Sequence, residues 1–137
     1  MADAIRPLPR LDEPDTAPFW TATKQHRLQY PVCDDCDTVV FYPRNFCPAC
    51  MSTSLTWKTS KGEGTVYSFS IVRLSRDLFF GGKAPYAVVL VDLDEGFRML
   101  SNLTGAEDVI TNLTIGQRVR VAWEDHEELS IPLFAPV

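Results

Sequence analysis

Apolar and polar residues alternate along much of the second half of the chain, with the period of two that half-buried β-strands show. Five such segments are separated by turn residues. One of these turns, Asp94-Glu95-Gly96, predicts a tight hairpin. The segments predicted to be strands are residues 65–73, 86–93, 97–103, 118–123 and 131–134.

The same pattern predicts which side chains lie on the same side of a strand. Tyr67, Phe69 and Ile71 are expected on one side of the first strand, and Val66 partly on the other. Residues 105–113 are expected to form one turn of helix. Five short strands at hairpin spacing favour a small closed barrel, and the five-stranded OB-fold is the natural choice.

The first half of the chain has a different pattern. Its first 15 residues are rich in Pro, Asp and Arg without periodicity, and predict a loose leader. Thr16 is a plausible N-cap, and Pro18 suits the first turn of a short helix over residues 17–25. Leu28, Tyr30 and Val32 then alternate with polar residues, which predicts a strand.

Four cysteines form two matched pairs, Cys33-x2-Cys36 and Cys47-x2-Cys50, separated by ten residues. Each C-x2-C pair lets two thiolates reach one ion from a tight knuckle, and two knuckles complete a tetrahedron of sulfur ligands. The apolar residues 39–42 between the pairs predict a hairpin arm. We therefore expect a rubredoxin-like zinc ribbon whose Zn²⁺ is structural, because all four positions are taken by protein ligands.

Three alternatives to zinc exist for these cysteines: iron, two disulfides and a redox site. Iron suits the same ligands. Two disulfides require an oxidising compartment, and a redox site requires one C-x-x-C pair. Many knuckles place Gly after the second Cys, whereas this chain has Asp37 and Met51 there. The predicted fold is mainly β, divided into a leader (residues 1–16), a helix with the zinc ribbon (17–58) and an OB-fold domain (59–137).

Composition narrows the functional classes. The chain has 137 residues and a net charge of −5, which argues against general nucleic-acid binding. No apolar run reaches the ~20 residues of a membrane span, and residues 1–14 have no signal-peptide core. We therefore expect a cytoplasmic protein.

Catalytic signatures are missing from the sequence. It has no cysteine beyond the four, no nucleophile elbow, no P-loop and no dinucleotide fingerprint. Its two histidines, His26 and His126, are expected to be exposed and not catalytic. The sequence therefore favours a binding or scaffold role.

The order of these features resembles a known family, the zinc-ribbon and OB-fold acyl-CoA-associated proteins long catalogued as a domain of unknown function. The resemblance covers about residues 17–135 and rests on Phe19-Trp20, the four cysteines, Pro43-Arg44, Gly62-x-Gly64-Thr65-Val66-Tyr67-Ser68, Pro85-Tyr86-Ala87, Ile115-Gly116 and Pro132-Leu133-Phe134. It implies a non-catalytic subunit, in a hetero-oligomer with a thiolase-like protein that supplies the reacting residues. It further implies a thiolase or retro-aldolase complex, with steroid side-chain degradation among the pathways, and a CoA thioester as ligand.

CoA has an anionic phosphate end and an apolar pantetheine arm. Basic side chains concentrate in residues 57–90, which carry net charge +3, so an anionic ligand should prefer this region. A solvated basic face explains this charge equally well. Phe79 and Phe80 are expected near the pantetheine arm or, equally, against a partner chain. The residues predicted to meet the phosphates are Arg44, Lys58, Lys61, Arg73 and Lys83. Two alternative functions stay open: a single-stranded nucleic-acid-binding module and a stand-alone acyl-CoA carrier.

Overall fold

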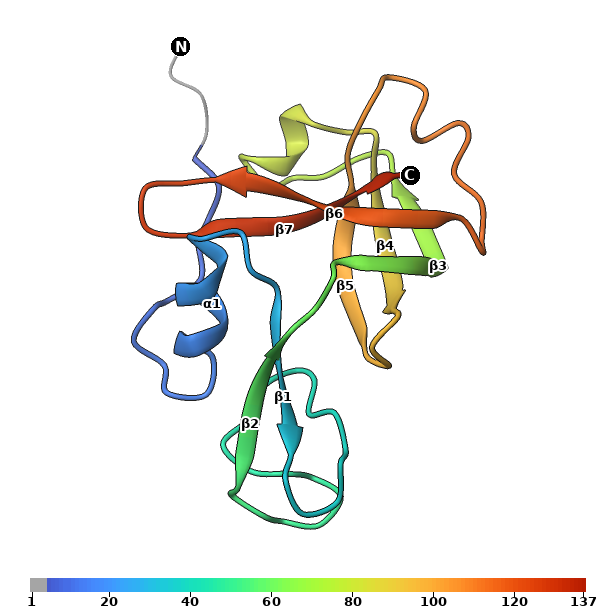
Figure 1. The fold of residues 1–137 in the computed structure, drawn as a ribbon. Coiled ribbons are helices and arrows are strands. Elements are labelled where there is room, and N and C mark those ends of the chain that lie inside the picture. The colour runs from blue at the N-terminus through green and yellow to red at the C-terminus, as the bar shows by residue number, and fades with distance from the viewer. Residues whose placement is uncertain (1–4) are drawn as a thin grey trace.

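The computed structural model describes residues 5–137 as two joined β-units with a short helix beside them (Figure 1). Two strands lead away from a barrel and end in the cysteine-bearing loops. The elements are α1 (Ala17–Thr23), β1 (Gln29–Cys33), β2 (Leu55–Thr59), β3 (Glu63–Val72), the 3-10 turn η1 (Phe80–Gly82), β4 (Tyr86–Leu93), β5 (Arg98–Leu103), β6 (Arg118–Asp125) and β7 (Ser130–Pro136).

The barrel is closed by five strands in the order β3-β4-β5-β7-β6. All neighbours are antiparallel except β5 and β7, which run parallel and share a single register pair, Leu103 with Phe134. This architecture confirms the predicted mainly β fold with a short helix, a ribbon and a five-stranded barrel.

The barrel interior is filled by the inward residues of every strand. In β4, burial alternates along the whole strand, and Ala87, Val89, Val91 and Leu93 point inward. Phe134 of β7 is fully buried and is among the largest side chains in this core. Burying a side chain of this class stabilises the fold by roughly 1.5–3 kcal/mol.

A β-bulge in β3 corrects one prediction. Val66 pairs with Val91 and Ser68 pairs with Leu90, so Tyr67 has no partner on β4. Val66 is 1% exposed and Tyr67 is 50% exposed. The expectation that Tyr67 shares a side with Phe69 and Ile71 is therefore wrong, because the extra residue changes which face each side chain takes.

The short helix α1 joins the two units. The Thr23 hydroxyl, which is buried, accepts the Ser130 backbone N–H at 3.1 Å at the start of β7. Phe19 meets Phe41 of the ribbon edge-on, with ring centroids 5.9 Å apart. Thr16 lies at the N-cap as predicted, although its side chain makes no capping hydrogen bond.

Residues 105–113 contain the expected single helical turn, because the Asn112 N–H donates to the Asp108 carbonyl at 3.0 Å, but the turn does not continue into a helix. In the described part of the chain, no helix has the length and apolar character that a membrane span requires.

Candidate functional site

The two cysteine loops are built in the same way. The Cys33 N–H donates to the Thr38 carbonyl at 2.9 Å, and the Cys33 carbonyl accepts the Asp37 N–H at 3.0 Å. The second loop has the same two bonds. The Cys47 N–H donates to the Ser52 carbonyl at 2.8 Å, and the Cys47 carbonyl accepts the Met51 N–H at 2.7 Å. Each loop thus folds into a knuckle that presents two sulfur atoms on one side.

The backbone conformation of the knuckles accounts for the unusual residues after the second cysteines. Asp37 has φ of 62° and Met51 has φ of 68°, both in the left-handed region. Glycine usually takes this conformation, because a Cβ atom clashes with the following carbonyl. Asp tolerates it better than Met does, so the second knuckle carries more strain than the first.

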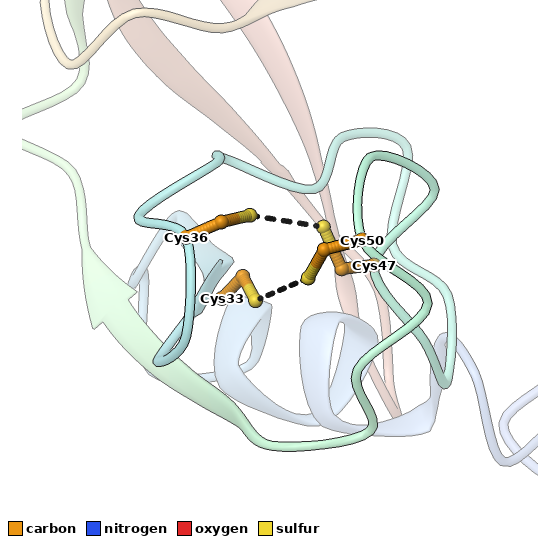
Figure 2. Close-up of side chains that lie close together, drawn as sticks. All are labelled: Cys33, Cys36, Cys47 and Cys50. Carbon is orange, nitrogen blue, oxygen red and sulfur yellow. Dashed lines mark hydrogen bonds between the residues drawn. The ribbon is translucent and has the colours of Figure 1, made fainter.

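The four sulfur atoms converge on one point (Figure 2). Cys33 Sγ lies 3.5 Å from Cys50 Sγ, Cys36 Sγ lies 3.6 Å from Cys47 Sγ, and all four lie within 4.8 Å of one another. A tetrahedral ion with Zn–S bonds near 2.3 Å requires sulfur separations of about 3.8 Å. A disulfide requires about 2.05 Å, so the cysteines are separate thiols arranged as a metal site.

The pKa values of the cysteine thiols indicate that all four lose their protons only when a cation is bound. The hydrogen bond with the Thr38 hydroxyl lowers the pKa of Cys36 to about 6. The Ser52 backbone N–H lowers the pKa of Cys50, but hydrogen bonds with the Cys33 and Cys36 thiols outweigh it and raise that pKa to about 12. Thiols this close cannot all ionise alone, so a divalent ion must supply the charge that makes all four thiolate ligands.

The ribbon sheet differs from the predicted arm. Residues 39–42 form no strand, and only an isolated bridge joins Val39 to Val32. Instead β1 pairs with β2 from Gln29–Thr59 to Cys33–Leu55, which places the first cysteine beside the strand that follows the second knuckle. The Asp34 carboxylate accepts hydrogen bonds from the hydroxyl groups of Ser54, just before β2, at 2.9 Å and of Thr56 in β2 at 2.7 Å.

Three of the predicted CoA-contacting residues come together beside the barrel. The Phe79 ring meets the Phe80 ring edge-on at 5.0 Å, and Lys83 Nζ lies 4.9 Å from the Phe79 centroid. Arg6, which the sequence did not single out, lies over both rings at 4.8 and 5.1 Å. Its side chain is 12% exposed and pairs with Glu124, which anchors part of the predicted loose leader to β6.

The remaining predicted basic residues do not join this cluster. Lys58 lies on β2, and η1 lies at the opposite end of the molecule from that strand (Figure 1). Arg44 lies in the ribbon between the knuckles, and Lys61 lies in the connection to β3. Arg73 follows β3 at the start of the loop that carries η1, and all four side chains are exposed. A single groove lined by all the predicted basic residues is therefore not formed.

A cavity of about 300 Å³ lies where helix, ribbon and barrel meet. It is lined by Thr16, Phe19 and Trp20, by residues 41–43 of the ribbon, and by residues 99–102 of β5 and 131–133 of β7. The sequence reasoning missed this site, because its walls come from four segments far apart along the chain. Its only local signal was the aromatic pair Phe19-Trp20 on a helix too short to stand alone.

Both histidines are engaged with carboxylates of the β6–β7 hairpin. The His26 ring stacks on Trp123 with centroids 5.4 Å apart, and its Nε2 lies 2.5 Å from Asp125 Oδ1. This hydrogen bond, with a second from Ser130, lowers the pKa of Asp125. His126 Nε2 lies 2.7 Å from Glu124 Oε2. These contacts give both rings structural partners.

Comparison with known families matches both units. Residues 20–56 match the model described as "ChsH2, rubredoxin-like zinc ribbon domain", and residues 57–124 match "ChsH2, C-terminal OB-fold domain". A solved structure described as "Ltp2-ChsH2(DUF35) aldolase" contains a chain with 34% identity and a TM-score of 0.81. That match covers 96% of this chain and 98% of the other.

Curated relatives have related descriptions. A "Probable enoyl-CoA hydratase alpha subunit" of Thermomonospora curvata is 37% identical over 97% of this chain, which spans 40% of that relative. A "3-oxo-4,17-pregnadiene-20-carboxyl-CoA hydratase alpha subunit" of Mycobacterium tuberculosis is 31% identical over 89% of this chain, which spans 38% of that relative. A "DUF35 domain-containing scaffold protein" of Methanocaldococcus jannaschii is 31% identical over 70% of each chain.

The chain thus spans about two-fifths of the two hydratase subunits, whereas it matches the aldolase chain over almost the full length of both. The converging cysteines, the closed barrel and these matches lead to one conclusion: the chain belongs to the ChsH2 family of zinc-ribbon and OB-fold (DUF35) proteins.

Proposed function

We propose that this chain is a non-catalytic subunit of a cytoplasmic acyl-CoA-processing complex. In this proposal a thiolase-like partner supplies the reacting residues and makes or breaks a C–C bond, and the present chain braces it. The observation that carries the proposal is the near full-length match to a chain of a structure described as an aldolase. The acyl groups named among the relatives, an enoyl group and a pregnadiene carboxyl group joined to CoA, are largely apolar, which makes apolar acyl-CoA the proposed substrate class.

The chemistry of the described residues agrees with a non-catalytic role. The four cysteines converge in the metal site, where a closed set of protein ligands leaves no position for substrate. Both histidine rings are hydrogen-bonded to carboxylates of β6. The proposal therefore assigns the reacting groups to the partner.

The outer face of the barrel supports a protein partner more than a nucleic acid. In OB-folds that bind oligonucleotides, the second and third strands form the binding face, which here corresponds to β4 and β5. The residues that alternate with the buried ones on these strands include Val88, Leu90, Leu100 and Asn102, which are uncharged. The cation on this face, Arg98, is paired with Asp92 at 2.6 Å. A face whose cation is already paired with a carboxylate is poorly suited to phosphates and better suited to a protein surface.

The CoA moiety is proposed to lie near η1. Phe79, Phe80 and Lys83 are already in contact there, and Arg73 begins the same loop. The aromatic rings suit the pantetheine arm, and the exposed ammonium and guanidinium groups suit phosphates. Arg44, Lys58 and Lys61 lie toward the ribbon, and any contribution from them to CoA binding is a separate prediction.

Co-expression tests the proposal. The chain is purified alone and together with a thiolase-like protein and, in parallel, with a hydratase-like protein from the same genome. Mass and activity of each sample are measured with acyl-CoA substrates. We expect a stable heteromer with the thiolase-like protein, C–C bond chemistry only in that heteromer, and no turnover by the chain alone. Efficient turnover by the isolated chain, or a heteromer formed only with the hydratase-like protein, would overturn the proposal.

A further inference from the structure

The cavity between helix, ribbon and barrel lies beside the seam between β5 and β7, where the two strands are paired at one end only. β5 and β7 share only the pair Leu103 with Phe134, next to which the Thr104 N–H donates to the Phe134 carbonyl at 2.7 Å. Earlier in β7, Pro132 has no N–H, and its carbonyl accepts the Ser101 hydroxyl at 2.7 Å. A side-chain contact thus takes the place of backbone pairing between residues 99–102 and 131–133, and the cavity lies beside this part of the seam.

The ribbon covers this opening and supplies a polar group. The Tyr42 hydroxyl accepts the Leu100 backbone N–H at 2.8 Å, which occupies a donor that β7 leaves unpaired. Phe19, Trp20 and Met99 form apolar walls. Among residues 5–137 no charged side chain lines the cavity, so a ligand that enters it should be neutral and largely apolar.

Two smaller hollows adjoin the cavity and lie between it and the η1 cluster of Phe79, Phe80 and Lys83. Leu100, Ser101 and Asn102 line both the cavity and a neighbouring hollow of about 230 Å³. Phe80, Tyr86 and Asn102 line that hollow and a further one of about 140 Å³, which also contacts Lys83 and the Arg6–Glu124 ion pair. This row of adjoining hollows, called the track, runs over the outside of β4 and β5. It leads from an end where the ammonium group of Lys83 is exposed, past hydroxyl and amide side chains, to a neutral apolar end.

We infer that this track binds an acyl-CoA thioester with its acyl chain in the cavity between helix, ribbon and barrel. The inference rests on the proposed function and adds the position and size of the acyl group. The order of chemistry along the track matches the ligand: anionic phosphates, then the amides of pantetheine, then an apolar chain. A cavity of 150 Å³ holds benzene, so about 300 Å³ holds a chain of about twelve carbons or two fused rings.

Neutral thioesters test the acyl end without involving the phosphates. S-acyl-N-acetylcysteamines with four, six, eight and ten acyl carbons are titrated into the zinc-loaded chain, and the NMR signals of the Trp20 indole and the Met99 methyl group are followed. Both side chains line the cavity. We expect the dissociation constant to fall by about fourfold for each added methylene, the value for burying one CH2 group.

Two leucines provide a matched pair of variants. Leu100 is 54% exposed and lies where the cavity and the adjoining hollow meet, whereas Leu74 is 83% exposed and lines neither. Leu100→Asp is expected to weaken binding of the octanoyl thioester at least tenfold, and Leu74→Asp less than twofold. Because both side chains are exposed, both variants should fold.

Three results would overturn the inference: a dissociation constant independent of chain length, signal changes away from Trp20 and Met99, or equal effects of the two variants. Absence of thioester binding, combined with protection of Trp20 in the heteromer, would assign the cavity to a side chain of the partner instead. Thioester binding without heteromer formation would retain the acyl site and reject the proposed function, so the two failures are distinguishable.

Discussion

Replacement of Met51 by glycine should stabilise the metal site. Met51 has φ of 68°, a conformation that costs about 1–2 kcal/mol for a residue with a Cβ atom. Its side chain is 69% exposed, so its removal loses little packing. Glycine also has more conformational freedom in the unfolded chain, and this entropy cancels about 0.5–1 kcal/mol of the strain that the substitution relieves. The net expectation is a gain of about 0.5–1 kcal/mol.

Metal affinity reports this gain most directly, because the residue after Cys50 adopts the strained conformation only when the knuckle is folded. Competition with a coloured chelator should show that Met51→Gly binds zinc about two- to fivefold more tightly than the parent chain. Met51→Ala is the matched control, because alanine keeps the Cβ atom and should leave the affinity within about twofold. Asp37→Gly should give a smaller gain than Met51→Gly, because Asp tolerates the left-handed region better.

Equal affinities of Met51→Gly and Met51→Ala would refute the reasoning, because the two variants differ at this position only in the Cβ atom. An increase in affinity for both would instead show that the methionine side chain itself disturbs the knuckle.

Three further predictions concern the barrel and the metal. Gly64→Ala should destabilise the protein by more than 2 kcal/mol in urea unfolding, because the new Cβ would lie 2.5 Å from the Asp92 carbonyl oxygen, whereas Gly82→Ala meets nothing within 4 Å and should be nearly neutral. Cys47→Ser should abolish stoichiometric zinc in elemental analysis and remove the protection of ribbon amides from hydrogen exchange, with barrel amides affected less. Hydrogen bonding to His26 and then Ser130 lowers the pKa of Asp125 when folded, so its stabilising effect is present above its unfolded pKa of about 4 and is lost as pH falls through the lower folded value. Urea midpoints of Asp125→Asn should therefore vary less with pH between about 2 and 5 than those of the parent chain, and parallel profiles would contradict this assignment.

The sequence alone determined the features that depend on short stretches of chain. The ligand spacing identified the metal site, because a C-x2-C knuckle is closed by hydrogen bonds within six residues. The sequence shows that the residues after the second cysteines, Asp37 and Met51, are unusual for this position, and both adopt positive φ. Alternation and turn residues located all five barrel strands to within a few positions, since these signals are local.

Tertiary structure decided every feature that depends on segments far apart in sequence. The bulge at Tyr67 became visible only through its register against β4, because alternation by itself does not show which strand contains an extra residue. Arg6 meets Phe79 and Glu124 although they are far apart in sequence, and the predicted basic residues are divided among the ribbon, its connection to the barrel and the η1 loop. The cavity depends on a proline in the last strand and a tyrosine in the ribbon meeting at one open seam. Local residue preferences fix knuckles, turns and strands, whereas the pairing of distant strands brings together the walls of a binding site, and no local pattern records that pairing.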